Sequence, residues 1–371
     1  MSKKVLIVHL GHWDQLQGGA EQQLEYLTKY LISIGNEVHR IFLNVNNKPI
    51  KSSEVSHYSI TLKQKLSIIG KNWFIYKEEI YGIAKQIDPD LLITRSYTSW
   101  AGIVAKFAGQ RKKKHLHFIA SDIELNFSLK TINWSKPLNL IEHYYYKKVY
   151  HFNSKIIVQN EFQKEALSRW YSKNGHKITQ ACPISDERLI EKDTDGLKIV
   201  WIGNFKAIKR PDLFITIADY FSNNCNYKFT MVGGFVEKRY ENLLKSHINN
   251  LNFEYTGELS NDHVNSILNK SHILINTSFV EGFSNTFLQA WMRKNIVISL
   301  NSNPDDILTN NDFGFLTGTV ENTVRTLKYV FKNRSSITQL GNNARNYTIQ
   351  NHSFEKVYSK IYELLNEENN H

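Results

Sequence analysis

The chain has 371 residues, of which 41% are hydrophobic and 12% aromatic. This composition supplies enough apolar side chains for packed cores and excludes a disordered protein, and the length favours two domains over one. The formal net charge of +11 favours polyanionic partners, a class that includes phosphorylated substrates, anionic lipid and nucleic acid.

The N-terminal segment begins with an apolar run, residues 5–10, that predicts a buried strand. Residues 1–4 show no signal sequence, and no stretch reaches the roughly 18 uncharged apolar residues of a membrane span, so we expect a soluble cytoplasmic protein. Gly18 and Gly19 follow in a loop before a helix predicted at 20–27. A glycine turn at a helix N-terminus lets a phosphate approach the backbone, but it also fits a plain connector because the Gly-x-Gly-x-x-Gly fingerprint is absent.

Apolar segments alternate with helical segments in two series along the chain. The first series comprises residues 5–10, 38–43, 91–94, 117–120 and 155–158, and the second comprises 198–202, 228–232, 251–255, 273–275 and 296–300. Strands that are apolar throughout indicate a parallel sheet covered on both faces. The sequence therefore predicts an α/β protein with two doubly wound, Rossmann-like domains, residues 1–185 and 196–352, followed by a C-terminal helix within 353–371. In such sheets ligands bind beyond the carboxyl ends of the strands.

Two segments of the first domain concentrate basic residues, 111–115 and the aromatic-rich 143–152. Interleaved aromatic rings and lysines suit a bilayer interface, and a buried helix with solvated lysines explains the second segment equally well. The residues of this candidate membrane contact are Arg111, Lys112, Lys113, Lys114, Tyr144, Tyr145, Lys147 and Lys148.

Metal chemistry has little support in the sequence. Asp88-Pro89-Asp90 has the Asp-x-Asp spacing that some transferases use to hold manganese, but proline and aspartate also form turns, and the segment precedes a strand instead of following one. The two cysteines, Cys182 and Cys225, lack metal-type spacing and agree with a reducing compartment. We therefore expect no metal site.

The most informative segment for function is 278–300. It places Glu281 in a turn with Gly282, offers Ser284 or Asn285 as the N-cap of a short helix, and ends in an apolar strand. A turn and helix N-terminus of this kind present backbone N–H groups to an anion. Gln289 follows Glu281 by eight positions, so both side chains could face one ligand.

This segment resembles the Glu-x7-Glu motif of family four of the glycosyltransferases, which are retaining enzymes of GT-B fold that use nucleotide-diphosphate sugars. The resemblance implies that Glu281 lies near the donor sugar and diphosphate. The second position of the motif, which binds the ribose hydroxyls, is here Gln289. An amide can still accept and donate one hydrogen bond each, without the strength of a carboxylate.

The loop at residues 203–211 resembles the Gly-Arg-x4-Lys-x-Pro segment of the same family, whose two cations neutralise the leaving diphosphate. Lys209 falls on the lysine position, whereas Asn204 stands where the family has arginine. Lys206 or Arg210 could replace the missing charge. Positioned cations matter because departure of a nucleotide diphosphate builds negative charge.

Gly18-Gly19-Ala20-Glu21 resembles the family's first glycine loop, which closes over the diphosphate from the opposite domain. Asp122 lies in an Ala-Ser-Asp sequence similar to a bacterial subgroup, where it would orient an acceptor hydroxyl, and a helix N-cap is an equally good use. The terminal helix is expected to cross back to the first domain. The resemblance implies a donor site at Gly18, Gly19, Asn204, Lys209, Gly233, Gly257, Glu281, Gly282, Phe283, Ser284, Asn285 and Gln289, with Glu281, Lys209 and Asp122 as catalytic residues.

The sequence thus predicts a metal-independent retaining hexosyltransferase, with UDP slightly favoured as the donor nucleotide and no cofactor besides that co-substrate. Residues 285–291 and 303–306 resemble enzymes of bacterial surface polysaccharide synthesis, such as capsule and lipopolysaccharide, which implies a lipid-linked saccharide acceptor at the inner face of the cell membrane. A UDP-sugar 2-epimerase of GT-B type is an alternative that needs no acceptor. A basic nucleic-acid-binding protein is the third alternative, for which the sequence shows no recognised motif.

Overall fold

The computed structural model describes residues 2–366 except 17, 46–48, 52, 63–69, 126–135, 186–188, 193–194 and 246–250. The chain divides into two compact units, Met1–Ala181 with Val357–His371, and Cys182–Lys356. The first unit therefore ends at Ala181, where the sequence analysis expects its end at residue 185. Residues 186–195, which separate the two predicted domains, lie partly outside the described residues.

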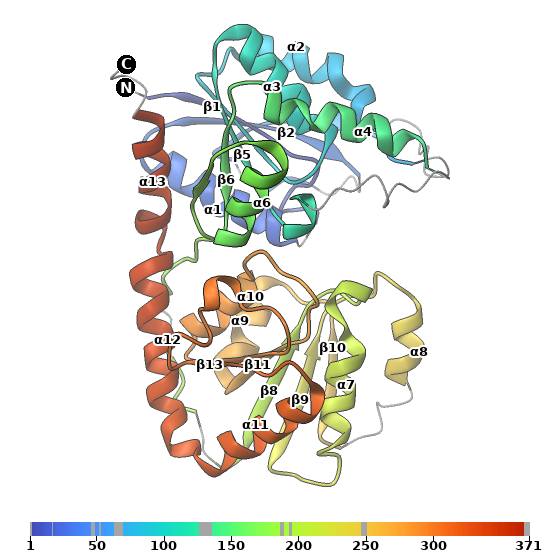
Figure 1. Cartoon of the computed structure of the whole chain (residues 1–371), viewed down its shortest axis with the longest axis vertical. Coiled ribbons are helices and arrows are strands. Elements are labelled where there is room, and N and C mark those ends of the chain that lie inside the picture. Colours follow the sequence, from blue (N-terminus) through green and yellow to red (C-terminus); the bar gives the residue numbers. More distant parts are fainter. Residues whose placement is uncertain are drawn as a thin grey trace. The chain divides into compact units, whose positions relative to one another are not determined.

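In the described part of the first unit, seven parallel strands form one sheet in the order β3-β2-β1-β4-β5-β6-β7. Figure 1 labels β1, β2, β5 and β6 of this sheet. The strands are β1 (Lys4–Val8), β2 (Glu37–Asn44), β3 (Ser56–Thr61), β4 (Leu91–Arg95), β5 (Lys114–Phe118), β6 (Lys155–Val158) and β7 (Gly175–Lys177). The helices are α1 (Gly19–Ser33), α2 (Lys77–Ile87), α3 (Ser99–Arg111), α4 (Leu138–Tyr146), α5 (Lys148–His151), α6 (Glu161–Tyr171) and α13 (Phe354–Asn366). Ile80 and Trp100 pack with Leu6 and Leu92 in one buried cluster, which fixes α2 and α3 on one face of the sheet.

Helix α13 packs against the first unit from Val357 onward. The ring of Tyr358 lies 5.3 Å from that of Tyr30 on α1, and Asn36 Nδ2 donates to the hydroxyl of Tyr362 at 2.6 Å. At its C-terminal end, Lys114 and Lys155 donate to the carbonyls of Leu365 and Leu364. Lysines at this position satisfy free carbonyls and oppose the negative end of the helix dipole.

The second unit has six parallel strands in its described residues, in the order β10-β9-β8-β11-β12-β13. The strands are β8 (Leu197–Ile202), β9 (Tyr227–Val232), β10 (Phe253–Gly257), β11 (Ile273–Asn276), β12 (Ile296–Ser299) and β13 (Gly314–Leu316). The helices are α7 (Pro211–Asp219), α8 (Arg239–Lys245), α9 (Asn261–Lys270), α10 (Asn285–Met292), α11 (Val320–Lys332) and α12 (Ile337–His352).

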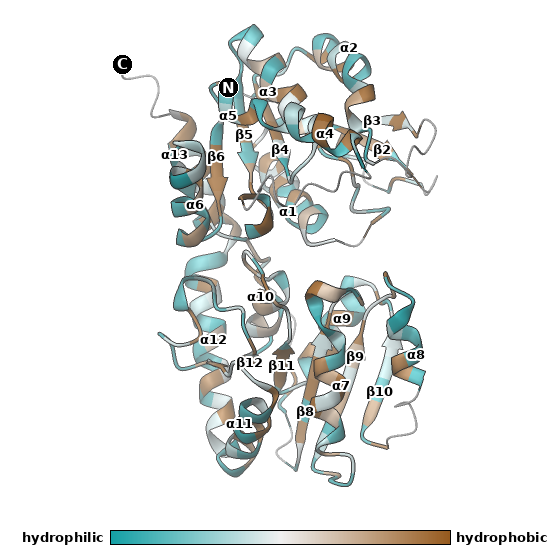
Figure 2. Cartoon of the chain, turned by 45° about the vertical axis from the view of Figure 1, so that its right-hand side comes forward, coloured by the Kyte–Doolittle hydropathy of each residue, from teal (hydrophilic) through white to brown (hydrophobic). Residues whose placement is uncertain are grey.

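Both faces of strand β11 are buried, because its successive side chains enter different cores. Ile273 and Ile275 of β11 join one cluster with Phe214 of α7, while Leu274 joins the other with Trp291 of α10. Figure 2 shows β8 and β11 as mostly hydrophobic, as expected of strands covered by helices. The predicted class, α/β with two Rossmann-like parallel-sheet domains, is confirmed.

Three short strands escaped the sequence analysis. β3 lies in a stretch that the sequence leaves irregular, and most of its side chains are polar and at least partly exposed, as expected of an edge strand. β7 and β13 have three residues each and also lie at the ends of their sheets.

Candidate active site

The candidate donor site lies where β8, β9, β10 and β11 of the second unit end. Gly203 N–H donates to Val232 O at 3.0 Å, and Gly233 N–H donates to Gly257 O at 2.9 Å, so three neighbouring strand exits are joined through glycines. Gly233 has a φ of +146°, and a Cβ there would overlap the carbonyl oxygen of Gly203. Only glycine fits this corner, and the corner keeps backbone groups close together at the sheet edge.

Glu281 and Lys209 meet at this edge. The Lys209 ammonium donates to Glu281 Oε1, and the same oxygen accepts from Ser278 Oγ at 2.7 Å and from Asn276 Nδ2 at 3.3 Å. Burial alone would raise the pKa of Glu281, but Lys209 and the two hydrogen bonds outweigh it and lower the pKa below its ordinary value. The side chain is therefore an ionised carboxylate at neutral pH.

The loop that carries Lys209 is fastened to the loop that carries Glu281. Thr277 Oγ1 donates to Lys209 O at 2.6 Å and accepts from Trp201 Nε1 at 2.9 Å, and Phe279 N–H donates to Ile208 O at 2.8 Å. These bonds fix both loops on the same strand ends. The relative position of lysine and carboxylate is thus built into the backbone.

Asn204 stands where the family has its second cation, and Lys206 and Arg210 are the candidates that could supply the missing charge. Asn204 is exposed and has no side-chain partner among the described residues. Arg210 donates from Nε to Thr277 O at 2.8 Å, which uses it in the loop framework. Burial lowers the pKa of Lys206, Lys209 lowers it further and Glu281 opposes the shift. Lys206 is therefore the remaining candidate for the second cation.

The turn after Glu281 leads into α10 with Gly282, Phe283 and Ser284 buried. Ser284 is the N-cap residue, but its hydroxyl bonds Thr286 Oγ1 at 2.9 Å and caps no backbone N–H of the helix. Asn285 is the first helical residue. Because no side chain caps the amino end of α10, its backbone N–H groups and positive dipole end could interact with an anion.

Gln289 is buried, with 6% of its surface exposed. Its Nε2 lies 3.5 Å from Asn265 Oδ1 of α9. That Gln289 and Glu281 face one ligand stays a prediction.

In the first unit, the glycine loop between β1 and α1 surrounds a carboxylate that sequence reasoning missed. Gly18 is the N-cap of α1, and a Cβ at Gly11 or at Gly18 would overlap one or the other carboxylate oxygen of Glu21. Glu21 Oε1 also lies 3.1 Å from His9 Nε2. Glu21 is the third residue of the helix, a position whose carboxylate stabilises the first turn. The glycines thus have a second role besides the predicted approach of a phosphate.

Arg40 of β2 supports the same loop from beneath. Its guanidinium is fully buried, donates to Gly11 O, and lies 4.2 Å from the centroid of the Trp13 ring. Burial lowers the pKa of Arg40 to about 9, against the opposing effects of Glu21 and Asp14. A sequence pattern could not identify it, because alternation in a strand does not predict a buried arginine.

Asp122 lies in a short 3-10 helix, Asp122–Leu125, and is buried. Its Oδ1 accepts from Gln163 Nε2 at 2.8 Å and from Asn160 Nδ2 at 3.3 Å, and Asn160 in turn caps α6. These contacts tie the loop after β5 to α6. They give Asp122 a structural use, and its predicted acceptor role stays a prediction.

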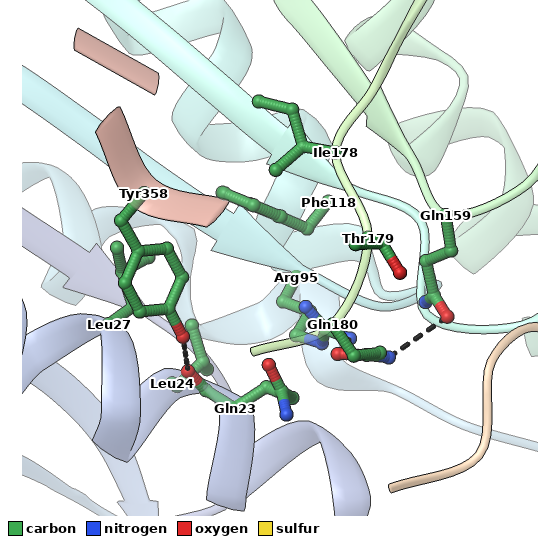
Figure 3. A pocket seen from close by; sticks show the side chains of 10 residues that line it. All are labelled: Gln23, Leu24, Leu27, Arg95, Phe118, Gln159, Ile178, Thr179, Gln180 and Tyr358. Atoms are coloured by element: carbon green, nitrogen blue, oxygen red, sulfur yellow. Dashed lines mark hydrogen bonds between the residues drawn. The ribbon is translucent and has the colours of Figure 1, made fainter. Parts of the chain in front are cut away.

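Two further charged residues near this loop were missed. Burial raises the pKa of Glu124 to about 8, partly opposed by hydrogen bonds from backbone N–H groups and by Arg95. Arg95 donates to Gln180 Oε1 at 3.2 Å, and Gln180 Nε2 donates to Gln159 Oε1 at 2.9 Å, around a small cavity that Tyr358 also lines (Figure 3). Gln159 N–H then donates to Gln163 at 2.8 Å, so a polar chain runs from Arg95 to Asp122.

Comparison with known protein families finds a match within the second unit. Residues 185–347 match the model of the family described as Glycosyl transferases group 1. The match covers most of the second unit, which we call the glycosyl transferase domain below. Its donor-site candidates Asn204, Lys209, Gly233, Gly257, Glu281 and Gln289 all lie within the matched residues. Among curated proteins, none matches this sequence.

Solved structures show that the chain has the GT-B fold. TarM from S. aureus, solved with Fondaparinux, alpha-GlcNAc-glycerol and UDP, is 12% identical with a TM-score of 0.77, covering 98% of this chain and 100% of TarM. HepE from Anabaena, solved with UDP and glucose, is 12% identical with a TM-score of 0.72, covering 98% and 99%. WaaG, a glycosyltransferase involved in lipopolysaccharide biosynthesis, is 11% identical with a TM-score of 0.74, covering 98% and 100%.

Outside the glycosyl transferase domain, the Asp88-Pro89-Asp90 segment connects α2 to β4. Asp88 ends α2 with a φ of +47° and pairs with Lys113 at 3.0 Å, and Asp90 accepts from Lys4 N–H at 2.8 Å. Across the described ranges, no group of three or more His, Cys, Asp and Glu side chains could hold a metal ion. Nor does any helix in those ranges have the length and hydrophobicity to cross a bilayer.

Proposed function

We propose that the protein is a retaining, metal-independent glycosyltransferase that moves a hexose-type sugar from a nucleotide-diphosphate sugar, with UDP favoured, to a saccharide acceptor. The observation that carries the proposal is the Lys209–Glu281 pair at the strand ends of the glycosyl transferase domain. UDP in the TarM and HepE structures and glucose in that of HepE support the donor class.

The chemistry follows from the charges at this edge. When the bond between sugar and diphosphate breaks, negative charge grows on the leaving phosphate, and the ammonium groups of Lys209 and Lys206 stabilise it without rearrangement. Glu281 holds the Lys209 ammonium in place and remains ionised beside the sugar. In a retaining reaction the acceptor hydroxyl attacks from the face of the departing phosphate, which accepts its proton.

We further propose a lipid-linked saccharide acceptor in bacterial surface polysaccharide synthesis, such as capsule or lipopolysaccharide, with the enzyme at the cytoplasmic face of the membrane. WaaG, described as acting in lipopolysaccharide biosynthesis, supports this class. Tyr144 is 64% exposed, and Lys148 Nζ lies 4.8 Å from its ring and 4.3 Å from that of Tyr145. This amphipathic surface on α4 and α5 suits a headgroup layer.

The predicted basic run 111–114 contributes less to a membrane contact. Lys113 pairs with Asp88, and Lys114 donates to the terminal carbonyl at Leu365, so both ammonium groups are engaged. Arg111 and Lys112 remain exposed. The membrane contact is therefore proposed for Tyr144, Tyr145, Lys147 and Lys148.

The test is transfer from radiolabelled UDP-glucose, UDP-galactose and UDP-N-acetylglucosamine to membrane lipid extracts, with the anomeric configuration of the product determined by NMR. Glu281→Ala should abolish transfer and slow donor hydrolysis, whereas Glu254→Ala, which removes an exposed carboxylate on β10, should leave both unchanged. Full turnover by Glu281→Ala would contradict the site. Interconversion of one UDP-sugar into another without acceptor would instead identify an epimerase.

A further inference from the structure

The glycosyl transferase domain has a second concave surface away from the strand ends that carry Lys209 and Glu281. A groove of about 620 Å³ lies between the edge strand β13, helix α11 and the first turns of α12. β13 is separated from β11 by β12 in the sheet, and none of the donor-site candidates lines the groove. The groove is therefore a separate feature of the domain.

Two pairs of side chains form its rims. Tyr329 and Asn333 are four residues apart on and just after α11, and Gln339 and Asn343 are four residues apart on α12. Residues at this spacing lie on one face of a helix, so both pairs project into the groove. Between them, the buried side chains of Leu308 and Val330 form an apolar floor.

The rim offers an exposed aromatic ring and free hydrogen-bonding groups. Tyr329 is 59% exposed, and its ring stands edge-on to that of Phe315 with centroids 6.5 Å apart. Asn333 Nδ2 donates to the backbone carbonyl of Tyr329 at 2.9 Å. The side-chain oxygen Oδ1 of Asn333 is not part of this bond. The amides of Gln339 and Asn343 make no hydrogen bond with any described residue. Each free amide can both donate and accept.

The charge of the lining narrows the ligand class. No lysine or arginine lines the groove and Asp312 is its one charged residue, although the chain carries a net charge of +11. Phosphates, nucleotides and anionic polymers therefore find no counter-charge there. An apolar floor, an open aromatic face and several amides match a ligand with alternating C–H faces and hydroxyl groups.

We propose that this groove binds a neutral oligosaccharide, at a site distinct from the one that holds the nucleotide sugar. The choice of a saccharide rests in part on the proposed transferase function, since a growing glycan is the polymer such an enzyme would meet. Tyr329 stacks against a sugar ring, and Asn333, Gln339 and Asn343 bond its hydroxyl groups. The groove would retain the acceptor chain between successive transfers.

The experiment is isothermal titration of the full chain with maltohexaose, cellohexaose, laminarihexaose and chitohexaose. At least one should bind, with the same affinity in wild type and in Glu281→Ala. Tyr329→Ala should weaken binding by about tenfold or more, as expected for removal of an aromatic anchor. Tyr220→Ala removes a tyrosine of nearly equal exposure, 58%, at the end of α7, and should bind as the wild type does.

Binding by none of the four hexasaccharides would overturn the proposal, as would binding that Tyr329→Ala leaves unchanged. Capture of an extended peptide along β13 in place of sugars would show a protein-docking edge and overturn it too. Because titration measures no turnover, absence of sugar binding by a wild-type protein that still carries out transfer contradicts the groove alone. Turnover retained by Glu281→Ala contradicts the donor site alone.

Discussion

Glu281 and Lys209 are 72 residues apart in the sequence, and the ammonium of one donates to the carboxylate of the other at the end of the second sheet. Their loops are joined by backbone and side-chain bonds of Thr277 and Phe279. Because these bonds, and not the ion pair, hold the two loops together, we expect that either side chain can be replaced without disrupting the loops at the strand ends. This separation makes the chemistry of the pair testable by mutation.

Lys209→Met should lower turnover by about 10²–10³-fold, the range seen when a positioned charge-stabilising donor is removed. Lys206 remains beside the site and accounts for residual activity. Steady-state kinetics with a labelled UDP-sugar measures the effect, and Lys228→Met, which removes an exposed lysine on β9, is the matched control. Equal turnover in the wild type and in Lys209→Met would remove the lysine from the mechanism.

Glu124 should make the protein less stable as the pH rises. Burial raises the pKa of Glu124 to about 8 in the folded state, from an ordinary value of 4.5. The folded state therefore holds a proton that the unfolded state releases, and this stabilisation is complete below pH 4.5 and lost as the pH rises through about 8. The slope approaches about 1.4 kcal/mol per pH unit between these limits.

Urea unfolding at several pH values checks this, because Glu124→Gln keeps the shape and removes the titration. The free energy of unfolding of the wild type should fall relative to that of Glu124→Gln between pH 5 and 8. A constant difference between the two proteins over this interval would show that the carboxyl group is already ionised when folded.

The glycine loop of the first unit allows a double-mutant cycle. Gly18→Ala places a methyl group against the Glu21 carboxylate and should cost about 1–3 kcal/mol of stability. Glu21→Ala removes the carboxylate that the methyl group would meet, so Gly18→Ala should cost almost no stability in that background. The coupling free energy between the two substitutions should therefore exceed about 1 kcal/mol. Thermal unfolding of the four proteins provides the measurement. Additive costs would mean that Gly18 is needed for something other than Glu21, such as a ligand phosphate.

The sheets could be predicted where strands are buried on both faces, and β8, β11 and β12 follow from their apolar runs. β3 could not, because an edge strand carries polar side chains that match a loop pattern. Length also limits the method, since β7 and β13 are too short to show a period.

Within the candidate site, Lys209 and Glu281 could be named from motif resemblance, and the structure brings them together. Preferring Lys206 to Arg210 as a candidate required the structure, because only the contact of Arg210 with Thr277 O shows where its guanidinium is directed. Arg40 and Glu124 were missed because patterns assign charged residues to the surface, and their burial depends on loops distant in sequence.

Gln23 of α1 contacts both segments that make up the first unit, near the end of the first and near the start of the second. Its side-chain amide donates to Ala181 O at 2.7 Å and accepts from Ala181 N–H at 3.0 Å. Its backbone carbonyl accepts from the hydroxyl of Tyr358 on α13 at 3.4 Å. A recombinant fragment that stops at Ala181 would therefore lack part of its own first unit. Chimeras that exchange the first unit between relatives need two gene junctions, one near codon 181 and one near codon 357, so that α13 is exchanged together with the unit it packs against.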